Sequence, residues 1–451
     1  MDILNKEAWE QKALIKAGAL SVQELMQETL ARIKTVNPIV NALVDLLNEE
    51  DCFNLTSENY ALERSLGGMP MAIKDLANVK GFKTTEGSPL YSGRVAEKDD
   101  QMVARLRAAG ALFIGKTNTP EFGLGSNTFN PVYGRTKNPY DLSKTCGGSS
   151  GGAAVALATR MLSISDGSDM MGSLRNPAAW NNIYGLRPTW GLVPPEPTGE
   201  IFLSQLSTLG PMARSPKDLA MLLDVQADRI ENESFISSTK TFNNFTEEPI
   251  MKGIKVGWLG DWSGTLPFED GLLDLSQEAL NEMSSLGAII HDLKAPFEMN
   301  DIWTSWSDLR AWQISNGLSA IYEDLEMRQY LKPEAVWEIE CGLSLSGQDI
   351  YKSALKKSKW YNSASELFEK FDLLVLPSTQ VWPFDLAEIY PVSINSQDMD
   401  TYHRWMQVTI PAGLLGLPVV NIPIGFGKKG LPAGLQLIGS KGSDGLSLIH
   451  I

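Results

Sequence analysis

The chain has 451 residues, of which 43% are hydrophobic and 21% charged, a composition typical of globular proteins that bury a core without disulfides or metals. Its formal net charge of −15 argues against a nucleic-acid partner, because phosphate binding needs a clustered basic surface. The three cysteines, Cys52, Cys146 and Cys341, are widely spaced without a CxxC pair, which excludes a disulfide framework and a cysteine-based zinc site and favours the reducing cytoplasm.

The first half of the chain alternates helix and strand patterns. The N-terminal residues MDILNKEAWEQ contain no apolar stretch, so we expect no secretory signal. Residues 21–36 predict a helix, because Ser21 and Glu24 form a capping box and apolar residues follow at helical spacing. The other predicted elements of this half are strands at 69–73 and 111–116 and helices at 101–109, 151–160 and 217–224.

The second half continues the alternation after a polar, irregular segment at 227–250, which we expect to be a surface excursion. Strands are predicted at 254–258, 287–293 and 371–378, and a helix at 270–285. Residues 408–426 approach the length of a membrane span, but their three prolines favour turns and short buried strands, so we expect no membrane partner. The alternation indicates one α/β domain with a largely parallel or mixed sheet.

Histidine is scarce, with only His291, His403 and His450, and no pair has metal-ligand spacing. A metal hydrolase is therefore poorly supported, and we expect no metal or cofactor. The stretch CGGSSGG matches GxSxG at both Ser149 and Ser150. A serine hydrolase with a histidine base stays open as an alternative, although the preceding NPYDLSKT does not have the strand pattern that such an elbow needs.

A serine nucleophile with a lysine base is the other option that the residues permit. Lys74 follows the apolar MPMAI, and a lysine buried by such a strand loses its proton readily. A surface pair of Lys74 with Asp75 would fit the pattern equally well. Ser173 follows a glycine-containing loop whose N–H groups could converge on an oxyanion, or whose glycines could merely form tight turns.

Six segments together resemble the motifs of the amidase signature family. They are GMPMAIKD (68–75), IGKTNTPEF (114–122), GGSSGG (147–152), GSDMMGSLRNPA (167–178), GLRPTWGLVP (185–194) and GLPAGLQLIG (430–439). The similarity spans about residues 15–440, essentially the whole chain. It implies one domain over residues 1–451, with a catalytic core at about 60–225 and a variable substrate funnel at about 226–400. It also implies a mixed sheet of about eleven strands covered by helices on both faces.

The resemblance assigns a role to each matching residue. Ser173 becomes the nucleophile, Ser149 the bridging serine after a cis peptide, and Lys74 the base. The backbone N–H groups of Met170, Met171, Gly172 and Ser173 become the oxyanion hole. Ser150, Asp169 and Arg175 become structural support, and Gly123 and Leu124 align with positions that line the acyl pocket in some members.

The chain departs from the family at several positions. Met171 replaces a glycine; it either narrows the acyl pocket or packs into the core, and we favour packing. Ser168 replaces a threonine and Cys146 a proline or glycine, and neither change indicates chemistry. The tryptophans of the variable region either line the substrate site or pack in the core, and packing is the better interpretation of each one singly.

We therefore expect an amidase that forms an acyl-enzyme on Ser173 and acts on small aryl or alkyl amides, such as anilides or linear oligoamides. The alternatives are the glutaminase (A) subunit of a tRNA-dependent amidotransferase and an amidohydrolase of urea- or biuret-like substrates. The expected partner is a small-molecule amide, and a homodimer stays open.

Overall fold

Local signals set the boundaries of the N-terminal helices. The computed structural model describes residues 3–57, 62–197, 200, 202–228, 242 and 251–445. Helix α2 (Val22–Val40) begins at Ser21, whose hydroxyl accepts from the Glu24 amide while the Glu24 carboxylate accepts from the Ser21 amide. The predicted capping box is confirmed, and the helix ends where Asn41 adopts the left-handed conformation.

Helices and strands alternate through the chain, as the hydrophobic pattern predicts. The helices are α1 (Ala8–Lys16), α2, α3 (Glu49–Ser57), α4 (Gln101–Ala108), α5 (Gly151–Ala158), α6 (Asn176–Trp180), α7 (Pro216–Gln226), α8 (Leu272–Ser285), α9 (Met299–Glu323), α10 (Leu325–Arg328), α11 (Pro333–Ser344), α12 (Gly347–Phe368) and α13 (Ile410–Leu415). The strands are β1 (Leu43–Val44), β2 (Pro70–Lys74), β3 (Leu112–Thr117), β4 (Phe129–Asn130), β5 (Gly134–Arg135), β6 (Ile164–Asp169), β7 (Tyr184–Arg187), β8 (Thr208–Ala213), β9 (Lys255–Trp258), β10 (Ile289–Asp292), β11 (Leu373–Pro377), β12 (Ser393–Ile394), β13 (Gln397–Asp398), β14 (Val419–Phe426) and β15 (Pro432–Ile438).

The largest sheet has eight strands in the order β10-β9-β11-β15-β14-β7-β8-β6. The pairs β10–β9 and β9–β11 are parallel and the others are antiparallel, so the sheet is mixed. The expectation of one sheet with about eleven strands is wrong. A separate sheet, in the order β1-β3-β2, places β2 beside β6.

A side chain interrupts the sheet between β2 and β6. The backbone N–H of Lys74, on β2, donates to the carboxylate of Asp166, on β6, at 3.1 Å. An N–H that is satisfied by a carboxylate forms no ladder bond with a neighbouring carbonyl. The two sheets therefore meet at a polar seam, and Lys74 lies on it.

Apolar residues pack against both faces of the large sheet. Successive side chains of a strand point to opposite faces, so a continuous apolar strand contributes to both. On β11, Leu374 and Leu376 join a cluster that contains Trp180, while Val375 joins a second cluster with Leu280 of α8. Helices therefore cover the sheet on both sides, as the family resemblance implied.

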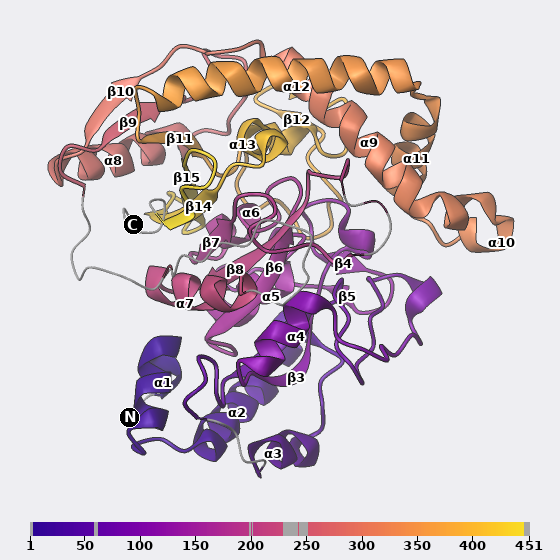
Figure 1. Ribbon diagram of the computed structural model, residues 1–451, viewed down its shortest axis with the longest axis vertical. Coiled ribbons are helices and arrows are strands. Elements are labelled where there is room, and N and C mark those ends of the chain that lie inside the picture. Colours follow the sequence, from indigo (N-terminus) through magenta and orange to yellow (C-terminus); the bar gives the residue numbers. More distant parts are fainter. Residues whose placement is uncertain are drawn as a thin grey trace.

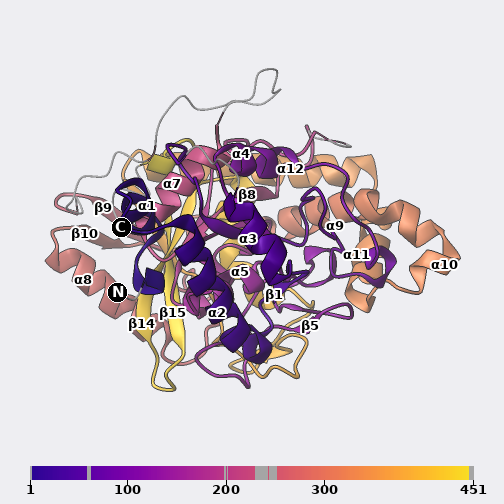
Figure 2. The same ribbon diagram turned by 90° about the horizontal axis from the view of Figure 1, so that it is seen from below.

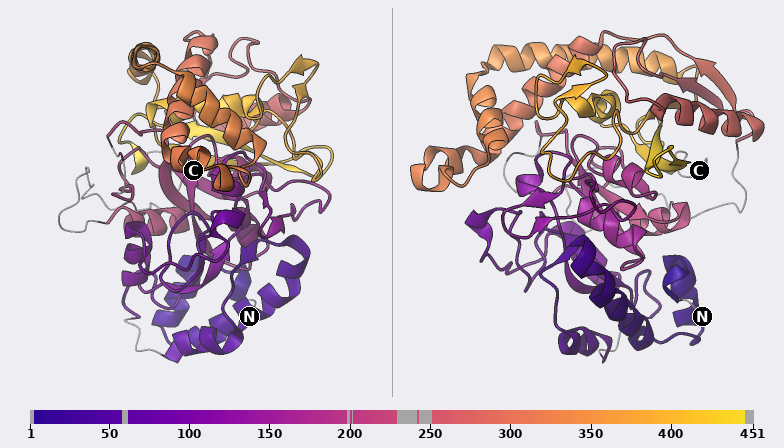
Figure 3. Two further views of the ribbon diagram at one scale, coloured as in Figure 1. Left: turned by 90° about the vertical axis from the view of Figure 1, so that its right-hand side faces the viewer. Right: turned by 180° about the vertical axis from the view of Figure 1, so that it is seen from behind.

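Helices α9, α11 and α12 form a layer at the top and right of Figure 1, opposite the N-terminal helices α1, α2 and α3. Figure 2 shows this layer beyond α5 when the molecule is seen from below, and Figure 3 shows the same separation from two further sides. Three tryptophans of this layer, Trp303, Trp306 and Trp360, are buried in the Trp180 cluster, whereas Trp337 on α11 is exposed. Core packing, the favoured interpretation of the tryptophans, thus holds for these three.

In the second half of the chain, the prediction for residues 408–426 is wrong, and the one for 227–250 falls largely on residues that the structure does not describe. Residues 408–426 hold the end of a 3-10 helix (Arg404–Thr409), helix α13 and the long strand β14 rather than turns and short strands. Most of 227–250 and His450 lie outside the described residues. None of the described helices combines the length and apolar composition needed to cross a bilayer.

Candidate active site

Lys74 ends the buried strand β2, and its side chain is 1% exposed. Its Nζ lies 2.8 Å from Ser149 Oγ, 2.8 Å from Ser150 Oγ and 2.9 Å from Ser168 Oγ. These contacts join β2, the loop before α5 and strand β6. The structure therefore brings Lys74 into the interior among serines, and the alternative of a surface pair with Asp75 is wrong.

Burial lowers the pKa of Lys74 from 10.5 to about 7, although the carboxylates of Asp166 and Asp169 oppose the shift. At neutral pH a large share of Lys74 is therefore a neutral amine. A neutral amine has two N–H bonds and one lone pair, so all three contacts are satisfied when one serine hydroxyl donates to Nζ. This arrangement suits a proton acceptor.

Ser149 and Ser150 stand at the turn into α5, and the peptide bond between Gly148 and Ser149 is cis, as expected. Ser150 has its own contacts: its hydroxyl accepts from the Ser168 amide at 3.3 Å, and its backbone N–H donates to the Ser173 carbonyl at 3.3 Å. Ser150 thus connects Lys74, β6 and the segment that carries Ser173.

Asp166 and Ser168 are site residues that the sequence did not reveal. They lie two positions apart on β6, so they share one face of that strand, and that face is turned towards Lys74. The available signal was the four polar residues in the six positions of 164–169, an unusual number for a buried strand. Burial raises the pKa of Asp166 to about 6.

Asp169 shapes the loop that follows β6. Its carboxylate accepts from the amides of Gly172 at 2.8 Å and Leu174 at 3.1 Å, and from Nη2 and Nε of Arg175 at 2.9 and 3.0 Å. The nearby guanidinium groups of Arg175 and Arg187 hold the pKa of Asp169 well below its usual range despite burial. The ion pair expected between Asp169 and Arg175 is present and fully buried.

The same loop was expected to supply four N–H donors for an oxyanion. Gly172 is already engaged, because its N–H donates to Asp169. No acceptor in the described part of the chain takes the N–H groups of Met170, Met171 or Ser173. Gly172 has φ +83°, and a Cβ there would come within 2.8 Å of Thr409, so this turn requires glycine.

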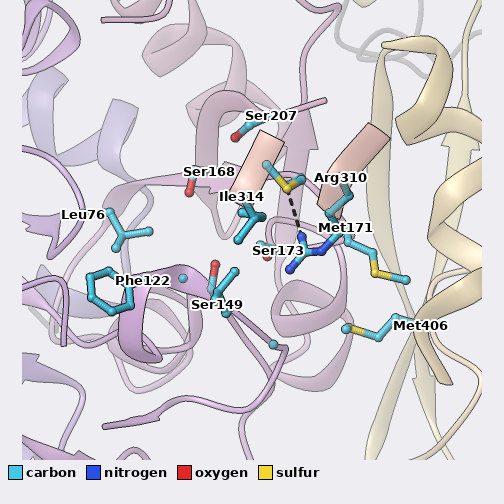
Figure 4. Close-up of a pocket in the computed structure, with 14 residues that line it drawn as sticks. Leu76, Phe122, Ser149, Ser168, Met171, Ser173, Ser207, Arg310, Ile314 and Met406 are labelled. Atoms are coloured by element: carbon cyan, nitrogen blue, oxygen red, sulfur yellow. Dashed lines mark hydrogen bonds between the residues drawn. The ribbon is translucent and has the colours of Figure 1, made fainter. Parts of the chain in front are cut away.

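A cavity of about 90 Å³ lies between these elements, and both Ser149 and Ser173 line it (Figure 4). Its wall is mostly apolar. The lining residues are Leu76, Phe122, Gly123, Leu124, Gly125, Ser149, Ser168, Met170, Met171, Ser173, Ser207, Arg310, Ile314 and Met406. No hydrogen bond links the hydroxyls of Ser149 and Ser173 in the described chain, but both reach the same space.

A larger cavity of about 280 Å³ adjoins the first, since Leu76, Ser168 and Ser207 line both. Lys74 and Asp166 line this second cavity as well. Lys74 and the serines around it therefore lie between the two cavities. The two cavities could hold the two sides of a substrate.

Met171 does both things that the sequence left open. It is 4% exposed and belongs to the apolar cluster around Trp180, and it also lines the smaller cavity. Gly123 and Leu124 line the same cavity. Gly123 has φ +68°, and a Cβ there would lie 2.8 Å from Leu76 and 3.7 Å from Ser149 Oγ, so glycine keeps the approach to Ser149 open.

The geometry does not support a GxSxG hydrolase with a histidine base. His291 is exposed on the edge strand β10, and His403 lies against Glu338, with its Nε2 3.1 Å from that carboxylate. The serine hydroxyls meet Lys74 instead. Cys146 is fully buried, as expected, and burial raises its pKa to about 12. Within the described ranges, no group of three metal-ligating side chains is found.

The sequence matches known proteins along nearly its whole length. A family model described as Amidase matches residues 24–448. The A subunit of the glutamyl-tRNA(Gln) amidotransferase of Alkaliphilus metalliredigens is 31% identical, over 94% of this chain and 90% of that protein. On the sequence alone, the glutaminase subunit of a tRNA-dependent amidotransferase is an alternative to an amidase of small aryl or alkyl amides.

Solved structures agree on the fold. A bacterial aryl acylamidase of the amidase signature family superposes with a TM-score of 0.89 at 25% identity, covering 99% of this chain and 94% of that one. The A subunit of the Thermotoga maritima glutamyl-tRNA(Gln) amidotransferase gives a TM-score of 0.82 at 27% identity, covering 100% and 94%. The chain is thus an enzyme of the hydrolase class that acts on amide C–N bonds, folded as one α/β domain, and it belongs to the amidase signature family.

Proposed function

We propose that this chain hydrolyses carboxylic amides through an acyl-enzyme on Ser173. The observation that carries the proposal is the buried Lys74, with a pKa near neutrality and its Nζ 2.8 Å from Ser149 Oγ, beside a cavity that Ser149 and Ser173 share. A base that is half neutral near pH 7 suits general-base catalysis. Ser149 stands between this base and the cavity.

Acylation begins with Ser173 Oγ attacking the amide carbonyl. Ser149 takes the proton of Ser173 and passes its own to neutral Lys74. The tetrahedral oxyanion accepts hydrogen bonds from the free amides of Met170, Met171 and Ser173, while Gly172 is committed to Asp169. The proton then returns through Ser149 to the leaving nitrogen as the C–N bond breaks.

Deacylation repeats the relay with water. Water loses a proton to Ser149 and Lys74 as it attacks the Ser173 ester, and the proton returns to Ser173 Oγ as the carboxylic acid leaves. Asp169 and Arg175 act as positioning residues, since their ion pair holds the turn between Gly172 and Leu174.

For the substrate, the cavity wall supports small aryl or alkyl amides. Its lining includes Leu76, Phe122, Leu124, Ile314 and Met406, which match an apolar group better than a zwitterion. A glutaminase subunit of an amidotransferase is the second candidate, because curated relatives at about one-third identity carry that name. A urea- or biuret-type substrate is the third.

The purified chain alone, assayed on acetanilide, hexanamide, glutamine and biuret, separates these candidates. We expect release of aniline or ammonia from the first two, and none from the Ser173→Ala variant at unchanged thermal stability. Turnover of glutamine alone would favour the subunit function. Full activity in Ser173→Ala would overturn the acyl-enzyme.

A further inference from the structure

One charged side chain lines the cavity that holds Ser149 and Ser173. Arg310 projects from α9 and is 5% exposed (Figure 4). Every other described lining residue is uncharged. A buried cation in an apolar wall next to the proposed nucleophile requires a physical account, because desolvation makes it costly unless it is paired.

The guanidinium is held from behind by two partners. Its Nε donates to Glu338 Oε1 at 2.7 Å, and its Nη2 donates to the Tyr402 hydroxyl at 2.8 Å. Among the residues that the structure describes, its Nη1 reaches only the thioether sulfur of Met170, at 2.9 Å. Thioether sulfur is a weak acceptor, and a guanidinium has five N–H groups. Nη1 is therefore a strong donor that has no oxygen partner in the described ranges of the chain, and Met170 lines the same cavity.

The pair behind the cavity wall carries no net charge. Although burial opposes the shift, the charge of Arg310 and hydrogen bonding lower the pKa of Glu338 to about 2 and keep this carboxylate ionised. Burial lowers the pKa of His403, which lies against Glu338, and raises that of Tyr402, so both are neutral near pH 7. A substrate carboxylate that entered this cavity would lose its hydration, and it would meet a cation whose charge Glu338 already balances.

We propose that Arg310 is a specificity-determining residue that donates from Nη1 to an uncharged oxygen of the substrate, outside the scissile amide. The oxygen belongs to an ether, hydroxyl or carbonyl group and displaces the flexible Met170 side chain. Glu338 makes the site reject carboxylates by neutralising Arg310. The inference rests on the proposed amidase function, since it names the substrate class of that site.

Two matched substrate series test the inference from both sides of the scissile bond. The acyl series is the p-nitroanilides of hexanoic, 4-methoxybutanoic and glutaric acids. The amine series is the acetanilides with a para ethyl, methoxy or carboxylate group. In one series we expect kcat/KM for the ether to exceed that for the alkyl analogue by about tenfold, with the carboxylate poorest.

The variants remove the donor or its counter-charge. Arg310→Met alone leaves Glu338 buried without its partner, so the main comparison uses the double variant Arg310→Met/Glu338→Gln, which removes both charges together. It should lose the ether preference. Glu338→Gln alone should raise kcat/KM for the carboxylate substrate relative to the ether substrate by about tenfold. In this variant no neighbouring carboxylate balances the positive charge of Arg310. Asn316→Ala, at an exposed position of the same helix and outside the lining of this cavity, should leave both ratios unchanged.

Failure of this inference is distinguishable from failure of the amidase function. If turnover depends on Ser173 but the ether-to-alkyl ratio is the same in wild type and the double variant, the role of Arg310 is overturned and the amidase function stands. If Ser173→Ala keeps full turnover, the proposed function itself fails. Calorimetric binding of the ether and alkyl substrates to Ser173→Ala gives a second readout without chemistry, and equal affinities would also contradict the inference.

Discussion

Replacing Lys74 by methionine should change how the stability of this protein depends on pH. The pKa of this amine is lower in the fold than in the unfolded chain, so folding releases its proton between about pH 7 and 10.5. The unfolded state binds more protons in that window, and stability therefore rises with pH. The resulting cost to folding is fully present below pH 7 and disappears above pH 10.5.

The magnitude follows from the pKa in the two states. One pKa unit corresponds to about 1.4 kcal/mol, so neutralising Lys74 costs about 4 kcal/mol at neutral pH and about 1 kcal/mol at pH near 9.5. Lys74→Met removes this cost. It also leaves three serine hydroxyls without the amine, but that loss does not depend on pH.

Urea denaturation of wild type and Lys74→Met at the two pH values measures the effect. The quantity compared is the free energy of unfolding of the variant minus that of wild type. This difference should be about 3 kcal/mol larger at neutral pH than at pH near 9.5. Ser207→Ala, a cavity residue without a titrating group, is the control and should show no such change. A stability difference for Lys74→Met that is the same at both pH values would mean that folding does not lower the pKa of Lys74.

Three further predictions concern the loop, the cavity and the reaction. Asp169→Asn should lower the free energy of unfolding by about 3–5 kcal/mol, because Arg175 loses its buried counter-ion; an unchanged urea midpoint would contradict this. Met171→Ala should cost about 2–5 kcal/mol and raise kcat/KM for hexanoyl over acetyl anilides, by emptying space in the cavity wall; an unchanged substrate ratio would place its side chain outside the acyl site. The kcat/KM of wild type should fall about tenfold per pH unit below the pKa of Lys74, near 7, and stay level above it, whereas a profile that is flat down to pH 5 would exclude Lys74 as the base.

Several elements of the fold could be predicted because their signals are local. The Ser21 cap, the apolar strands before Lys74 and at 371–378, and the small-residue helix after Ser150 all have short-range patterns, and each is present. The split between two sheets could not be predicted. It depends on the Asp166 carboxylate meeting the Lys74 amide across 92 residues. The long helices α9 and α12 were also missed.

The site shows the same division. Motif resemblance brought Lys74, Ser149 and Ser150 to attention, and the structure places them in contact. It gave no sign of a role for Ser168, whose replacement of threonine indicated no chemistry and which nevertheless contacts Lys74. Arg310 was missed as well, because its partners come from α11 and from the segment before Trp405, far away in sequence.

The substrate is where sequence similarity and cavity chemistry diverge. The second candidate function, a glutaminase subunit, would require a site for glutamine, which carries both an ammonium and a carboxylate. The cavity beside Ser173 offers mostly apolar side chains and an arginine whose charge Glu338 already balances. The assay of the purified chain on acetanilide, hexanamide, glutamine and biuret decides between these two.

Acylation of Ser173 is the step on which the proposed reaction depends, and mass spectrometry of the intact protein detects it. The purified enzyme is mixed with the p-nitroanilide that it turns over fastest, quenched in acid within the first turnovers, and mapped by peptide fragmentation. We expect an acyl adduct on the peptide that contains Ser173, and no adduct in Ser173→Ala. An adduct on Ser149 or Ser150 would contradict acylation of Ser173. So would turnover that leaves no adduct on wild type and persists at full rate in Ser173→Ala.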